Sequence, residues 1–194
     1  MRRPLVFALI LALLTGVGYG IYILHFQTYH FAVVQDGVMY RDGLQGMRRF
    51  RNAYALHPFK AVINLQSDSD IATKYHAQVD EEKKFCAENQ IAYFSISMKE
   101  ETPPTDAQIV EFLKIADDPK NRPVFVHDSQ GVIREGMMVG VWQIERMGYD
   151  TTRALNEINW FGHANKSQAL IDFIQNYKKI ADRPAPEPAP SLAR

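Results

Sequence analysis

Short apolar segments alternate with helical patterns along most of this chain. Residues 61–65, 91–96 and 123–127 are short apolar runs rich in branched or aromatic side chains, as in buried strands. Strands that alternate with helices predict an α/β fold with a mostly parallel central sheet flanked by helices. Binding sites in such sheets lie at the carboxyl ends of the strands, so functional residues are expected there.

The remaining elements follow from local signals. Residues 31–41 resemble two short strands around the Asp36-Gly37 turn. Thr105 or Asp106 is a candidate cap for the helix that follows. Further helices are expected over residues 45–56, 71–89, 151–161 and 166–180. Another is expected from Arg134 onward, where Met137, Val141 and Ile144 have helical spacing.

The N-terminal segment predicts a membrane anchor. Residues 5–24 carry no charge and follow Arg2 and Arg3, and about 20 apolar residues can cross a bilayer. The two arginines predict a cytoplasmic N-terminus and an extracytoplasmic domain, as in a bacterial envelope protein, with residues 4–24 in the membrane. A signal segment followed by secretion is the alternative, although cleavage-site residues of the A-x-A type are poorly represented.

The chain therefore divides into an anchor (1–27), one domain (28–181) and a Pro/Ala-rich tail (182–194) that is expected to be disordered. Lys+Arg and Asp+Glu number 22 each, which argues against nucleic acid as a partner. No acidic cluster has metal-ligand spacing, so neither a metal nor a cofactor is expected. The single cysteine, Cys86, excludes an intrachain disulfide.

The segment between the strand at 123–127 and the next helix is the candidate site. A glycine-containing loop at such a junction can direct backbone N–H groups inward, and the helix N-terminus adds positive potential. Arg134 could close this anion-binding loop with a planar guanidinium. The predicted loop residues are His127, Asp128, Ser129, Gln130, Gly131, Val132, Ile133 and Arg134.

These residues resemble the phosphate-binding loop of the protein tyrosine phosphatase superfamily, in its dual-specificity-like branch, which reads His-Cys-x5-Arg. His127, Gly131 and Arg134 are in register, but Asp128 replaces the cysteine and Glu135 replaces the usual Ser or Thr. The resemblance extends over about residues 31–180.

The resemblance implies a phosphatase-like domain whose nucleophile position holds Asp128. In the family a thiolate attacks phosphorus and an acid from a neighbouring loop protonates the leaving group, so Glu100 or Glu101 is the candidate acid. We expect the Asp128 carboxylate to occupy the loop itself. Two like charges about 4 Å apart repel by about 4 kcal/mol at an effective dielectric near 20, so phosphate affinity should be weakened.

Three functions remain open from the sequence. The first is a catalytically inactive pseudophosphatase that binds or scaffolds a phosphorylated or anionic ligand, or an unidentified protein partner. The second is an active phosphoester hydrolase that uses Asp128 or an activated water. The third is a purely structural, membrane-anchored interaction domain. The segment would then be an ordinary strand-to-helix turn in which Asp128 or Ser129 caps the helix and Arg134 pairs with a carboxylate.

Overall fold

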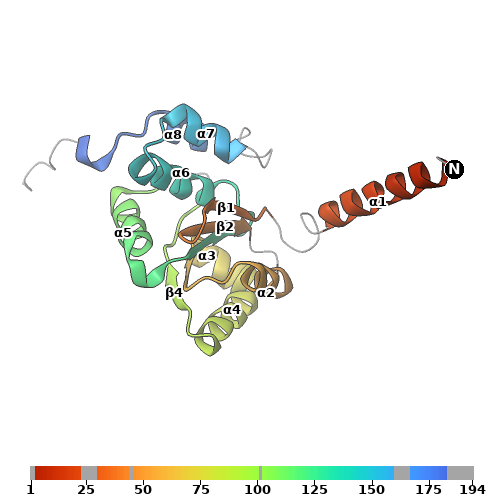
Figure 1. Cartoon of the computed structure of the whole chain (residues 1–194). Helices are drawn as coiled ribbons and strands as arrows, with labels where there is room; N and C mark the ends of the chain where they lie inside the picture. The colour runs from red at the N-terminus through yellow and green to blue at the C-terminus, as the bar shows by residue number, and fades with distance from the viewer. Residues whose placement is uncertain (1–2, 23–29, 44–45, 101, 160–166, 183–194) are drawn as a thin grey trace, which may run out of the picture.

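The computed structural model describes residues 3–22, 30–43, 46–100, 102–159 and 167–182. An α/β domain follows an N-terminal helix, α1 (Arg3–Tyr22), which extends away from it (Figure 1). The strands are β1 (Ala32–Gln35), β2 (Met39–Gly43), β3 (Ala61–Asn64), β4 (Ala92–Ser95) and β5 (Val124–Asp128). The other α-helices are α2 (Met47–Leu56), α3 (Asp68–Asp70), α4 (His76–Glu88), α5 (Asp106–Asp117), α6 (Arg134–Arg146), α7 (Thr151–Asn159) and α8 (Gln168–Gln175).

The five strands form one mixed sheet in the order β1-β2-β5-β3-β4. β1 pairs with β2 in antiparallel orientation, through a turn in which Gly37 has φ +67°. The pairs β2–β5, β5–β3 and β3–β4 are all parallel. The predicted α/β class and mostly parallel sheet are therefore confirmed, and β5 lies in the middle of the sheet.

Apolar side chains cover both faces of the sheet. Val124 and Val126 of β5 join a core cluster with residues of α5, α6, α7 and α8. Phe125, between them, joins a second cluster with residues of α2 and α4. Successive strand side chains point to opposite faces, so one apolar strand serves both clusters. Figure 1 shows α6, α7 and α8 on one side of the sheet and α2 and α4 on the other.

The helix predictions hold in outline but not at every boundary. Thr105 caps α5 in a capping box with Gln108, as one of the two alternatives predicted. The single helix expected over 71–89 is instead α3, a π-helical turn (Ile71–Tyr75) and α4. The helix expected over 166–180 ends at Gln175, and Asn176 closes its last turn.

The prediction of a transmembrane N-terminal helix is wrong. Among the described residues, no helix combines the length and the apolar character that crossing a bilayer requires. In α1 the unbroken apolar run covers only residues 5–14, because a threonine and glycines interrupt it from residue 15 onward. A span takes about 20 predominantly apolar residues. The single-pass location predicted from residues 4–24 is therefore wrong as well.

The division into 1–27, 28–181 and 182–194 stays a prediction. All of the expected tail except residue 182 lies outside the described part of the chain. Residues 23–29 and 160–166 lie outside it too.

Candidate functional site

The candidate loop leaves the carboxyl end of β5 and turns into α6 within five residues. Gly131 lies at the tightest point, with φ +70°. A Cβ atom there would lie 2.7 Å from the Asp42 carbonyl oxygen and would also meet the Gly43 backbone. Only glycine accommodates both the backbone conformation and this contact with β2, which explains its place in the motif.

The loop closes around the Asp128 side chain, which is 2% exposed. Its Oδ1 accepts hydrogen bonds from the backbone N–H groups of Gln130, at 2.8 Å, and of Gly131. Its Oδ2 lies 3.4 Å from the backbone nitrogen of Glu135, in the first turn of α6. The amide groups that an anion-binding loop would offer to a ligand are thus directed at a carboxylate of the chain itself.

The Arg134 guanidinium lies across the same loop and is buried. Its Nε is 3.5 Å from Asp128 Oδ2, and its Nη2 donates to Ser129 Oγ at 2.8 Å. Its Nη1 donates to Asp70 Oδ2 at 2.8 Å and to the Met98 carbonyl at 3.3 Å. Both terminal nitrogens therefore donate to oxygens of the chain, while the buried Nε makes no hydrogen bond within the described residues.

The contact with Arg134 changes the pKa of Asp70. Burial acts to raise the pKa of its carboxyl group, but the hydrogen bonds from Arg134 and Ser67 and the positive charges of Arg134 and Lys74 outweigh burial and lower the pKa. Asp70 is thus a second carboxylate held against the guanidinium, placed there by α3. Asp70 is not among the site residues predicted from the sequence.

Glu135 forms a buried ion pair behind the loop. Its Oε1 lies 2.7 Å from Arg41 Nε, and the two side chains are 0% and 4% exposed. Arg41, in β2, also donates to the Gly131 carbonyl at 3.2 Å. Burial raises the pKa of Glu135 well above its usual value, the carboxylates of Asp128 and Asp42 add to this, and Arg41 opposes it. Two elements distant in sequence are thereby joined at the loop.

His127, the residue before Asp128 at the end of β5, contacts the buried Glu82 of α4. Its Nε2 lies 2.8 Å from Glu82 Oε1, and both side chains are completely buried. Its Nδ1 lies 3.3 Å from the Asp128 carbonyl oxygen. Burial acts to lower the pKa of His127, but the charge and hydrogen bond of Glu82 outweigh it and raise the pKa.

Glu82 is also absent from the predicted site residues, although the sequence carries a signal for it. Val79, Glu82 and Cys86 are the buried residues of α4, and their spacing of three and four places them on one helix face. A glutamate on an otherwise apolar helix face needs a buried partner. That rule predicts a buried cation or donor opposite Glu82, which is the position of His127.

Neither candidate acid, Glu100 or Glu101, has a described contact with the loop. Glu100 is exposed in the segment after β4, and the group of this segment that contacts Arg134 is the Met98 carbonyl. Glu101 lies outside the described residues. In the described part of the chain, no three His, Cys, Asp or Glu side chains are grouped so that they could hold a metal ion.

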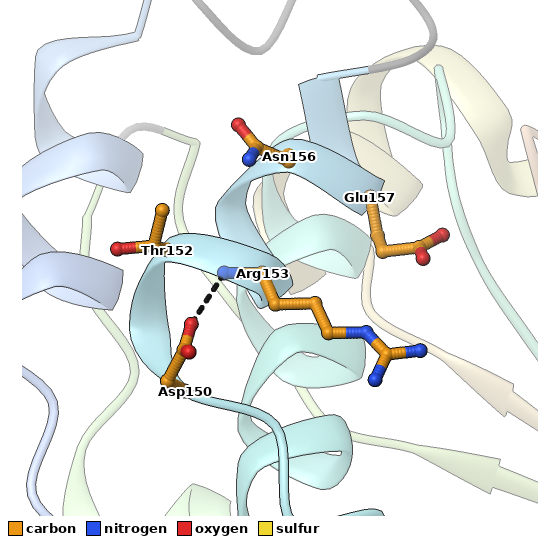
Figure 2. Close-up of a pocket in the computed structure, with 5 residues that line it drawn as sticks. All are labelled: Asp150, Thr152, Arg153, Asn156 and Glu157. Atoms are coloured by element: carbon orange, nitrogen blue, oxygen red, sulfur yellow. Dashed lines mark hydrogen bonds between the residues drawn. The ribbon is translucent and has the colours of Figure 1, made fainter.

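Two surface hollows are lined by residues outside the loop. Figure 2 shows the first, on α7 and the turn before it, where Asp150 accepts a hydrogen bond from the Arg153 backbone at 2.7 Å. Its other lining residues are Thr152, Asn156 and Glu157. The second is lined by Ala32, Val33, Val34, Arg41, Gln143, Tyr149 and Glu157. Neither includes a residue from 127 to 134.

Comparison with known proteins identifies the fold. The structure is similar to the core catalytic domain of the PP-IP phosphatase Siw14 from S. cerevisiae, with a TM-score of 0.63 and 20% identity over 76% of this chain and 85% of that one. It is also similar to TpbA from P. aeruginosa, with a TM-score of 0.56 and 18% identity over 73% of this chain and 81% of that one. No curated protein sequence matches the chain.

The family assignment rests on a sequence model. The model described as "DSP-PTPase phosphatase fused to NAD+ Kinase" matches residues 51–173, which include β3, β4, β5 and the whole candidate loop. This match confirms the resemblance to the protein tyrosine and dual-specificity phosphatases that the loop residues predicted. The chain therefore belongs to the DSP-PTPase phosphatase family that this model describes.

Proposed function

We propose that this chain is a pseudophosphatase, a phosphatase-fold protein without phosphatase activity that acts as a binding or scaffolding module. The observation that supports this proposal is the position of the Asp128 carboxylate. It stands where the family has its nucleophilic cysteine and accepts hydrogen bonds from the loop amides of Gln130 and Gly131.

The chemistry of a carboxylate supports loss of activity. A cysteine thiolate attacks phosphorus readily, and the positive loop stabilises both the thiolate and the transferred group. The Asp128 oxygens are instead directed at the loop amides and at α6, so an incoming phosphoryl group would have to displace them. Aspartyl-phosphate chemistry is commonly assisted by a divalent cation, which neutralises the carboxylate and the phosphate.

Charge in the loop also disfavours phosphate. Each unit of negative charge on a phosphate about 4 Å from the Asp128 carboxylate is repelled by about 4 kcal/mol, which corresponds to a loss of about a thousandfold in affinity per unit charge. Arg134 offers little compensation, because Asp70, Ser129 and Met98 already accept from its terminal nitrogens. Phosphorylated or anionic ligands should therefore bind weakly, and a protein partner would bind through other surfaces of the domain.

Hydrolysis of an aryl phosphate tests the proposal. The purified full chain is assayed with and without added Mg²⁺ or Mn²⁺, beside the Asp128→Asn variant. No turnover above the buffer rate is expected in either protein. Turnover by the wild type that disappears in Asp128→Asn would identify Asp128 as an active nucleophile, and the proposal would be wrong.

A further inference from the structure

The partners of His127 restrict its protonation state. Nε2 faces the Glu82 carboxylate at 2.8 Å, and Nδ1 faces the Asp128 carbonyl oxygen at 3.3 Å. A carbonyl oxygen only accepts hydrogen bonds, and an ionised carboxylate does the same. A neutral imidazole has one N–H and could serve only one of these oxygens, whereas an imidazolium can donate to both.

The His127–Glu82 pair is shielded from water. Both side chains are completely buried, and the rings of Phe50 and Phe125 pack against the imidazole. Water therefore screens neither charge, and a buried carboxylate is stable only beside a cation or donors. Glu82 is thus a partner that favours the proton on His127.

Other titratable groups face the pair. Cys86, on α4, and Tyr93, on β4, both lie near Glu82, whose charge together with burial raises the pKa of Cys86 to about 12 and raises the pKa of Tyr93. Neither group is charged at neutral pH. Asp128 is the other carboxylate that acts on His127, and its charge also favours the imidazolium.

We infer that His127 is an imidazolium at neutral pH, held by Glu82, that places a positive charge next to the loop and so stabilises the Asp128 carboxylate within it. Glu82 is then a positioning residue: it acts on the loop through His127 and contacts no ligand. The inference rests on the proposed self-filled loop and adds a third source of positive potential to the amides and Arg134.

The protonation of His127 can be measured directly by ¹⁵N NMR of imidazole-labelled protein, with the His127→Gln variant used only to assign the signal. At about pH 7.5 a free imidazole is mostly neutral. We expect both His127 nitrogens to show imidazolium shifts at that pH, and Glu82→Gln to lose them. Glu81→Gln is the matched control, because Glu81 is the adjacent residue but is exposed and pairs with Arg51.

Coupling to the loop is tested by Asp128→Asn, which keeps the side-chain shape and removes the charge. We expect the His127 titration to move to lower pH in this variant. A neutral His127 in the wild type, or a titration unchanged by Asp128→Asn, would overturn the inference. The aryl phosphate assay is independent of these signals, so turnover there refutes the proposed function without affecting the protonation result.

Discussion

Arg41 Nε lies 2.7 Å from Glu135 Oε1, and this ion pair is buried directly behind the loop that carries Asp128. It joins β2 to the first turn of α6, and Arg41 also holds the Gly131 carbonyl. Glu135 occupies a position where the family usually has Ser or Thr. The residue that departs from the family motif, Glu135, is therefore paired with Arg41, which also contacts the loop at Gly131.

Removal of Arg41 should destabilise the folded protein. In Arg41→Met, Glu135 loses its buried partner and Gly131 loses a donor, and the free energy of unfolding should fall by about 3 kcal/mol. Urea denaturation measures this. Arg51→Met is the control, because the Arg51–Glu81 pair has the same 2.7 Å separation but is exposed, and its loss should cost less than about 1 kcal/mol. Equal losses in the two variants would contradict the importance of the buried pair.

Stability should fall with rising pH through Glu135. Its pKa is raised in the folded protein, chiefly by burial, so the folded state holds a proton that the unfolded state releases above about pH 4.5. The stabilisation is complete below that pH and is lost as pH rises towards the folded pKa. Denaturation curves across this range should be flatter for Glu135→Gln than for the wild type, whereas Glu111→Gln, on the exposed face of α5, should match the wild type. An unchanged slope in Glu135→Gln would show that another group controls the effect.

Two glycines with similar φ angles should differ in their tolerance of alanine. Gly131→Ala combines left-handed strain with a clash against Asp42 and Gly43, and should cost about 3 kcal/mol or more of folding free energy. Gly37→Ala at φ +67° meets no atom within 4 Å and should cost only about 1 kcal/mol. Thermal or urea unfolding gives both values. A mild effect at Gly131 would mean that the loop and β2 can move apart easily.

Asp128→Cys should restore a weak phosphatase activity. The loop amides and Arg134 would stabilise a thiolate in place of the carboxylate, so hydrolysis of an aryl phosphate should rise by about tenfold or more over the wild type. Asp128→Ser is the control, since it leaves the loop without a carboxylate or a thiol and should stay inactive. A folded Asp128→Cys protein that neither hydrolyses the substrate nor binds vanadate would indicate a loop geometry unable to hold a phosphoryl group.

Much of the fold was predictable because its signals are local. Branched apolar runs predicted the strands, the capping residue types at Thr105 and Asp106 predicted a helix start, and the alternation of elements predicted a mostly parallel sheet. The N-terminal segment was misjudged because its lack of charge was given more weight than the residues after position 14 that dilute its hydropathy.

The candidate site was only partly predictable. The motif identified His127, Asp128, Gly131 and Arg134, which adjoin one another in sequence. Their partners Glu82, Arg41 and Asp70 come from three other elements. Nothing local in the sequence pairs residues that far apart, because such contacts depend on the order of the strands and on the way helices pack across them. The charge partners of a buried motif therefore had to come from the three-dimensional structure.

Oxyanion titration of the wild type and Asp128→Ala by calorimetry, at constant ionic strength, is the most direct test of the self-filled loop. The alanine variant removes the internal carboxylate and leaves the loop amides available to vanadate or phosphate. We predict that it binds the oxyanion at least about a thousandfold more tightly than the wild type, since the repulsion removed is about 4 kcal/mol per unit charge of the oxyanion. Equal affinity in the two proteins would contradict the account, because Asp128 would then not be the group that occupies the loop.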